Sequence, residues 1–269
     1  MADTSQKTVL ITGSNSGIGA ATAKFFIEKG WNVAATMRNI EKASSWMNCE
    51  NCATFRLDVT SETSITEAIS QVIERFRNID ILVNNAGYGL KGPLEGITPE
   101  QLERQFATNV FGLINVTKHI TAIMREQGGG TIVNISSIGG RIAFPFNSAY
   151  HATKFAIEGL SESLRFELKP FNIRIKLIEP GGIKTDFVTR SQEWAKHPAY
   201  EPQLSKMLHL TTRLNNTLPG PEGVAKVIYK ASTDSSNKLR YLVKTGPYLK
   251  VNTIFPDAIW RSLVGSVLR

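Results

Sequence analysis

The chain has 269 residues, with 31 Lys and Arg against 23 Asp and Glu, a net charge of +8 and a pI near 9.5. The basic residues are spread along the chain without a cluster interleaved with aromatic side chains, which argues against nucleic-acid binding, and no apolar run reaches membrane-spanning length. We expect one α/β domain over residues 1–269 and, because Met1–Lys7 has no signal-peptide pattern, a cytoplasmic location.

Strand-like and helical segments alternate along the chain, which favours a parallel, doubly wound sheet with helices on both faces. The strands are predicted at 7–12, 32–37, 54–57, 79–83, 131–135, 173–178 and 240–243, and the helices at 18–29, 61–76, 98–125 and 148–168.

A glycine-rich turn, Thr12-Gly-Ser-Asn-Ser-Gly-Ile-Gly19, joins the first strand to the first helix. Such a turn lets main-chain N–H groups and a helix N-terminus approach a pyrophosphate. The glycine spacing differs from G-x-G-x-x-G, and a tight strand-to-helix connection is the alternative reading.

Tyr150 and Lys154 lie four residues apart on a predicted helix and therefore share one of its faces. A phenol that works as an acid or base at neutral pH needs its pKa lowered from about 10, which takes about 4 kcal/mol of phenolate stabilisation. We expect the Lys154 ammonium to supply much of it. Ser137, thirteen residues before Tyr150, could polarise the oxygen that gains or loses the proton, and this spacing favours it over Ser136.

Five sequence elements in the same order resemble the classical short-chain dehydrogenase/reductase family, over about residues 7 to 190. They are the glycine turn, Asn84-Asn-Ala-Gly87, Asn109, Ser137 with Tyr150-x-x-x-Lys154, and Pro180-Gly181. The resemblance implies a Rossmann-type fold, seven strands in one layer between two helical layers, and a nicotinamide cofactor.

The resemblance also implies roles for individual residues. Asn109, Ser137, Tyr150 and Lys154 would be catalytic, Asn109 by positioning a water that links Lys154 to solvent. Tyr150 and Lys154 would also contact the cofactor, and Lys154 would hold the nicotinamide ribose. The remaining cofactor contacts would be Gly13, Ser14, Asn15, Ser16, Gly17, Ile18, Gly19, Asp58, Val59, Asn85, Ala86, Gly87, Pro180, Gly181, Ile183 and Thr185. Asp58 could instead cap a turn, and Asn84–Gly87 could serve mainly to brace the sheet.

Arg38 follows the second strand, where NAD-specific relatives carry an acidic residue. No Asp or Glu occurs from Trp31 to Ile40, and a guanidinium matches the geometry of a 2′-phosphate. We predict NADP(H), with the Ser14 hydroxyl on the same phosphate; a surface arginine without this role is the alternative.

The substrate site is expected to be apolar, with Ser137, Phe144 and Phe187 among its residues and the segment 182–220 as a substrate loop. A steroid, retinoid, fatty or aromatic carbonyl would fit, and the pattern weakly resembles the hydroxysteroid and retinol dehydrogenase branch. The C-terminal segment 247–269 has helical apolar periodicity from Ile254 to Leu268, and could form a lid, an interface or a peripheral membrane contact.

The predicted reaction is the NADP(H)-dependent interconversion of a carbonyl and a secondary alcohol by a homodimer or homotetramer. A 3-oxoacyl thioester reductase, or a non-catalytic NADP(H)-sensing or scaffold protein on the same fold, is the alternative. Cys49 and Cys52 are expected to be reduced thiols in a loop, and we expect no metal.

Overall fold

The computed structural model describes residues 6–185, 192–215 and 217–245. Phe187 and the C-terminal segment 247–269 lie outside the described residues, so their predicted roles remain predictions.

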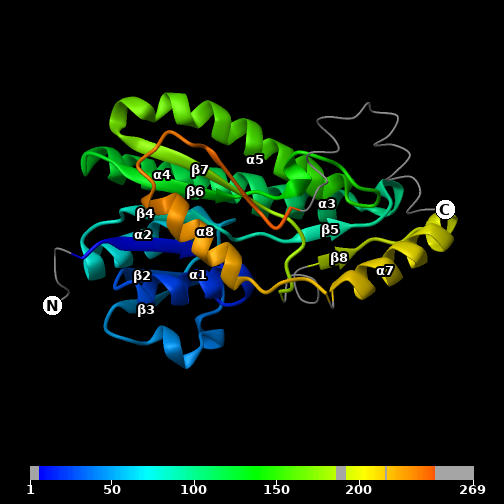
Figure 1. The fold of residues 1–269 in the computed structure, drawn as a ribbon, viewed down its shortest axis with the longest axis horizontal. Coiled ribbons are helices and arrows are strands. Elements are labelled where there is room, and N and C mark those ends of the chain that lie inside the picture. Colours follow the sequence, from blue (N-terminus) through cyan, green and yellow to red (C-terminus); the bar gives the residue numbers. More distant parts are fainter. Residues whose placement is uncertain (1–5, 186–191, 216, 246–269) are drawn as a thin grey trace.

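A seven-stranded parallel sheet forms the centre of the fold, in the order β3-β2-β1-β4-β6-β7-β9 (Figure 1). This confirms the predicted doubly wound sheet with seven strands. The strands are β1 (Thr8–Thr12), β2 (Asn32–Met37), β3 (Cys52–Arg56), β4 (Ile81–Asn84), β6 (Gly130–Ile135), β7 (Ile173–Pro180) and β9 (Arg240–Val243).

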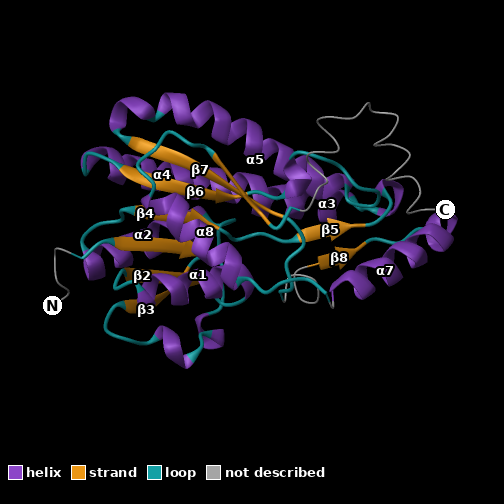
Figure 2. Ribbon diagram, viewed as in Figure 1, coloured by secondary structure: helices purple, strands orange, loops and turns teal. Residues whose placement is uncertain are grey.

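Helices cover both faces of the sheet (Figure 2). Successive residues of a strand point to opposite faces, so each strand contributes apolar side chains to both helical layers. In β1, Leu10 packs on one face with residues of α2 (Glu62–Phe76), α4 (Gly112–Glu126) and α5 (Ser148–Glu167). Its neighbours Val9 and Ile11 pack on the other face with residues of α1 (Gly17–Glu28) and α8 (Glu222–Thr233). All three β1 side chains are fully buried, as expected for a central strand of a parallel sheet.

The helix predicted at 98–125 is interrupted. Thr98 begins α3 (Pro99–Phe106) with a capping box to Gln101, and a π-helical turn, Ala107–Phe111, separates α3 from α4. Such turns insert one extra residue per turn and occur often at functional sites, and this one contains Asn109.

The segment 182–220, predicted as a loop, contains regular structure. Strand β8 (Gln192–Trp194) pairs with β5 (Gly89–Lys91) in a small parallel sheet beyond the main one, and α7 (Glu201–Asn215) follows. Helix α8 is also absent from the predicted helices, although Val224, Ile228 and Ala231 have helical spacing. Single-turn 3₁₀ helices lie at 40–42, 45–47, 94–96, 138–140, 169–171 and 198–200. Within the described ranges, no helix is long and apolar enough to cross a membrane.

Candidate active site

The glycine turn has no room for side chains at its critical positions. Gly13 and Gly17 have φ angles of +70° and +54°, which favour glycine. A Cβ on Gly19 would lie 2.2 Å from the Gly13 oxygen and 2.6 Å from the Asn85 amide nitrogen. The turn therefore keeps its main chain free of side chains next to the start of α1, an arrangement that lets a pyrophosphate approach main-chain N–H groups closely.

Asn85 and Ala86 hold this turn in place from the end of β4. The Asn85 side chain donates to the main-chain oxygens of Thr12 at 2.9 Å and Gly13 at 3.0 Å. The Thr12 hydroxyl accepts from the main-chain N–H groups of Asn85 and Ala86, each at 3.0 Å. Part of the Asn84–Gly87 motif thus braces the glycine turn, and Thr12 is a supporting residue whose role the sequence did not reveal.

Ser14 has a structural role within the glycine turn. Its side chain is fully buried, and its hydroxyl donates to the Ile11 carbonyl at 2.8 Å and accepts from Thr36 N–H at 3.2 Å. This hydroxyl ties the turn to β2, and its predicted contact with the 2′-phosphate remains a prediction. The contact keeps the end of β2, and hence Arg38, next to the turn.

Arg38 is exposed, and no hydrogen bond or ion pair engages it within the described part of the chain. The strand residue before it, Met37, is buried. A free guanidinium beside the glycine turn fits a phosphorylated ribose, and no carboxylate occupies the position that would repel one.

Asp58 and Val59 have local structural roles. The Asp58 carboxylate accepts from the Thr60 N–H at 2.9 Å and hydroxyl at 2.7 Å, which makes it a turn cap, the alternative to cofactor binding. The Val59 side chain is buried against Gly112, and a Cβ added to Gly112 would lie 2.6 Å from the Val59 side chain. Both residues follow β3 at the carboxyl edge of the sheet, where a cofactor would bind. Their contact with an adenine ring remains a prediction.

Three catalytic candidates converge where β6 ends and α5 begins. The Ser137 hydroxyl accepts from Gly139 N–H at 3.0 Å and is hydrogen-bonded to the Tyr150 phenol. The Lys154 ammonium donates to the Ile135 carbonyl at 2.8 Å and lies 5.7 Å from the centroid of the Tyr150 ring.

The pKa of Tyr150 does not follow our expectation. Burial raises it to about 12, opposed by the hydrogen bond from Ser137, whereas the Tyr150–Lys154 spacing predicts a lowered pKa set by Lys154. Burial also lowers the pKa of Lys154 to about 8, and the Glu158 carboxylate raises it. Burial therefore favours the protonated phenol, which is the form that a proton donor needs.

Asn109 lies beside this group. Its side chain accepts from Tyr88 N–H at 3.0 Å and donates to the Tyr88 carbonyl at 2.9 Å and the Thr153 hydroxyl at 3.2 Å. Gly87 passes so close that a Cβ would lie 3.0 Å from the Asn109 Oδ1. The amide therefore fixes the segment after β4 against α5, and its role in holding a water remains a prediction.

His151 is a supporting residue that the sequence analysis missed. It is buried; its Nδ1 contacts the Gly139 carbonyl at 2.7 Å, and its Nε2 accepts from Phe144 N–H at 2.9 Å. Because Nε2 accepts, the Nδ1 must carry the proton, and burial lowers the pKa of the ring. His151 thus links the Ser137 turn to Phe144. Its position next to Tyr150 was the available signal.

Two buried carboxylates, Glu158 one helical turn after Lys154 and Glu179 in β7, pair with the more exposed Arg141 and Arg240, a group that the sequence analysis also missed. Glu158 accepts from Arg240 Nε at 3.1 Å, and Glu179 lies 3.3 Å from the same nitrogen and 3.4 Å from Arg141 Nη1. Burial, then the neighbouring Glu158, raises the pKa of Glu179 to about 7. The i, i+4 spacing of Lys154 and Glu158 could have indicated this group.

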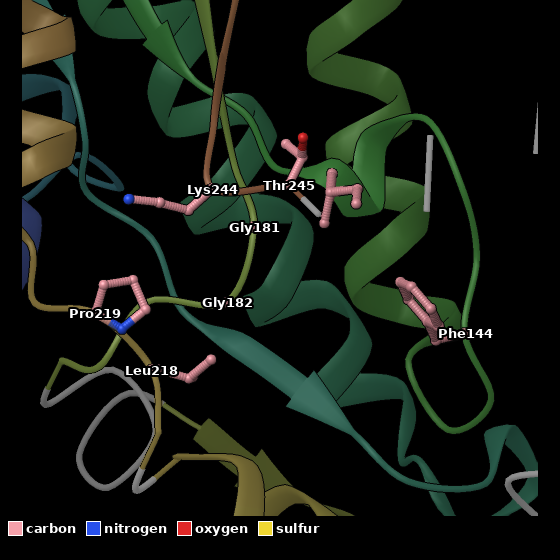
Figure 3. A pocket seen from close by; sticks show the side chains of 8 residues that line it. Phe144, Gly181, Gly182, Leu218, Pro219, Lys244 and Thr245 are labelled. Carbon is pink, nitrogen blue, oxygen red and sulfur yellow. The ribbon is translucent and has the colours of Figure 1, made fainter. Parts of the chain in front are cut away.

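A largely apolar pocket of about 430 Å³, which Lys244 and Thr245 also line, borders the site. Figure 3 shows the Phe144 side chain on one side and Leu218 and Pro219 on the other, with the chain at Gly181 and Gly182 between them. Ile138, which directly follows Ser137, also lines it. The predicted substrate residue Phe144 therefore lies in a pocket next to the catalytic group.

The residues after β7 are close to the glycine turn. Gly181 donates to the Val243 carbonyl at 2.8 Å after Pro180 ends the strand. A Cβ on Gly17 would lie 3.3 Å from the Thr185 side chain, so residue 185 reaches the turn. The Ile183 side chain is buried in the core, and any contact with a cofactor would come from its main chain.

Asn15, Ser16 and Ile18 complete the turn. Asn15 is exposed, and Ser16 occupies the N-cap of α1 without a side-chain capping hydrogen bond. Ile18 packs against the core.

The family profile "short chain dehydrogenase" matches residues 7–196. An uncharacterized oxidoreductase of Schizosaccharomyces pombe is 43% identical over 216 residues, which cover 79% of this chain and 89% of the relative. The 3-ketodihydrosphingosine reductase of Bacteroides thetaiotaomicron is 34% identical over 246 residues, which cover 90% of this chain and 89% of the relative.

Solved structures with a similar fold include members of the same family. A short-chain dehydrogenase from Streptomyces avermitilis has a TM-score of 0.83 and 32% identity, with 97% of this chain and 96% of that chain covered. ElxO with NADP bound has a TM-score of 0.73 and 30% identity, covering 90% and 98%. A 3-ketoacyl-(acyl-carrier-protein) reductase from Brucella melitensis complexed with NADH has a TM-score of 0.76 and 25% identity, covering 89% and 97%.

Proposed function

The chain belongs to the short-chain dehydrogenase family of oxidoreductases, and from this premise we propose that it reduces a carbonyl to a secondary alcohol with NADPH. The observation that carries the proposal is the hydrogen bond between Ser137 and Tyr150, with the Lys154 ammonium 5.7 Å from the phenol ring.

Tyr150 donates the proton. Burial raises the pKa of its phenol to about 12, which favours the protonated form, and the developing alkoxide is a stronger base that can accept the proton. Ser137 donates a hydrogen bond to the same substrate oxygen, and Lys154 stabilises the phenolate that remains. The reverse reaction uses the same groups, with the phenolate of Tyr150 as the base.

NADP(H) fits the residues at the other end of the site. The narrow glycine turn would hold the pyrophosphate, and the exposed Arg38 would hold the 2′-phosphate. When bound, the nicotinamide supplies or accepts the hydride. Relatives have been solved with NADP and with NADH, and the absence of an acidic residue from Trp31 to Ile40 supports NADP(H) for this chain.

The substrate body is apolar in this proposal, because Ile138, Phe144 and Leu218 line the adjacent pocket. A 3-oxoacyl thioester reductase is the second candidate, favoured by the likeness to the Brucella melitensis reductase. The test is a panel of ketones, 3-oxoacyl thioesters and secondary alcohols, followed by nicotinamide absorbance with NADPH and with NADH. Oxidation of NADPH by an apolar ketone supports the proposal, and turnover of none of the compounds contradicts it.

A further inference from the structure

Lys91 ends β5 on the edge of the site, and the proposed reaction gives it no role. Its register partner in β8 is Trp194, and the ammonium lies 5.3 Å from the centroid of the indole. The side chain is half-buried, and burial lowers its pKa to about 8, so it is still a cation at neutral pH.

Within the described part of the chain, no hydrogen bond or ion pair engages the Lys91 ammonium. The neighbouring carboxylates are occupied: Glu193 accepts from Gln101 at 2.6 Å and from Arg104 at 3.2 Å. Because alternate strand residues face opposite ways, Glu193 points to the other face of β8 from Trp194. Glu95 contacts His197 at 3.6 Å. A partly desolvated cation without an anion is unfavourable unless a ligand compensates it.

Lys91 lies near the reacting group. The next residue, Gly92, donates to the Phe146 carbonyl at 2.8 Å, which joins β5 to the segment that carries Phe144. The Lys91 charge also acts on His151, whose pKa it helps to lower, and the His151 ring lies 6.0 Å from the Tyr150 ring. A substrate whose carbonyl oxygen is bound by Ser137 and Tyr150 would therefore extend toward Lys91. An anionic group close to that carbonyl could reach the ammonium.

We propose that Lys91 binds an anionic group of the substrate, a carboxylate or a phosphate, while the apolar part of the same molecule occupies the pocket beside Phe144. This inference rests on the proposed function, and it narrows the substrate class from apolar carbonyls to amphipathic ones with a negative charge. The shared chemistry is an oxyanion that accepts hydrogen bonds from an ammonium held over an indole face.

Binding can be measured without turnover. Decanoate, decyl phosphate and neutral decanol share one alkyl chain and lack a carbonyl, and each is titrated by calorimetry into the full-length protein saturated with NADP⁺. We expect at least one of the two anions to bind wild type more tightly than decanol, and Lys91→Gln to weaken that binding about tenfold or more without changing decanol. The anion that shows the effect distinguishes a carboxylate from a phosphate.

Two further variants make the test specific. Lys91→Arg keeps the charge and is expected to retain most of the anion affinity. Lys24→Gln removes a matched cation, 5.0 Å from the Trp46 ring but on the exposed side of α1, and is expected to change nothing.

The inference is overturned if wild type binds decanol as tightly as both anions, a comparison that needs no variant. It is also overturned if Lys91→Gln weakens the binding of all three ligands to the same extent. Failure of the proposed reaction has a different signature. Charge-selective binding would then persist while no carbonyl in the panel is reduced.

Discussion

The Lys154 ammonium donates a hydrogen bond to the main-chain carbonyl of Ile135, 2.8 Å away. This bond ties α5 to the end of β6, two residues before Ser137, so one contact sets the distance between the lysine, the serine and Tyr150. The fold itself therefore helps to place the catalytic candidates relative to one another.

Arg38 is predicted to select the cofactor. Replacing it by alanine removes a charged hydrogen bond to the 2′-phosphate, worth about 1.5–3 kcal/mol, and should raise the KM for NADPH roughly tenfold or more with little effect on NADH. Steady-state kinetics with both cofactors measure this. Arg125→Ala, which removes an exposed arginine at the end of α4, is the control. An unchanged NADPH preference in Arg38→Ala would contradict the assignment.

Two glycines predict opposite effects of the same substitution. Gly19→Ala places a Cβ 2.2 Å from the Gly13 oxygen and should disrupt the turn, so NADPH binding falls sharply. Gly159 lies within α5 and is exposed, and a methyl group added there would meet no atom of the described residues within 4 Å beyond its own stretch of helix. Gly159→Ala should therefore stabilise the protein by about 0.5–1 kcal/mol and leave binding unchanged. Cofactor titration and urea unfolding test both; normal binding in Gly19→Ala would show that the turn is not the cofactor site.

Glu179 predicts a pH dependence of stability. Because its pKa is raised from 4.5 to about 7 in the folded protein, its contribution is fully present below pH 4.5 and is lost as pH rises through 7. The free energy of unfolding should lose on the order of 3 kcal/mol from this group over that range. Glu179→Gln should flatten the dependence in urea titrations at several pH values. Glu162→Gln, which changes a partly exposed carboxylate of α5, should not flatten it, and an equal effect of both variants would refute the assignment to Glu179.

His151 is predicted to position Ser137 and Phe144. His151→Ala removes contacts to Gly139 and Phe144, which should reduce stability by about 1–3 kcal/mol and lower kcat. Because protonated Nε2 cannot accept from Phe144, wild-type turnover should also fall at acidic pH while His151→Gln shows a weaker fall. Stability and pH-rate profiles provide the two readouts. If the acid limb is unchanged in His151→Gln, the histidine is only structural.

The sequence predicted the sheet well and its surroundings less well. Fully apolar runs such as Val9–Ile11 are typical of central strands of a parallel sheet, and the glycine turn follows directly from them. The β5–β8 pair could not be predicted, because each strand has three residues and they meet only through tertiary contacts. The π turn at Asn109 has no periodicity signal in a helical run of 28 residues.

At the candidate active site too, features that depend on tertiary contacts could not be predicted from the sequence. The spacing of Ser137, Tyr150 and Lys154 was sufficient to expect them together, but the direction of the Tyr150 pKa shift depends on burial, which spacing does not reveal. Likewise the sequence did not reveal that the Ser14 hydroxyl accepts a hydrogen bond from Thr36, because Thr36 lies on another strand.

Tyr150→Phe is the most direct test of the proton-donor role. The substitution keeps the ring and removes only the hydroxyl, so the fold and NADPH affinity should persist, and kcat for a ketone that wild type reduces should fall by about 10²–10⁴-fold. Single-turnover reduction followed by NADPH absorbance, with NADPH binding measured on the same sample, gives both quantities. Wild-type turnover in Tyr150→Phe would contradict the mechanism and leave the non-catalytic cofactor-binding reading in its place.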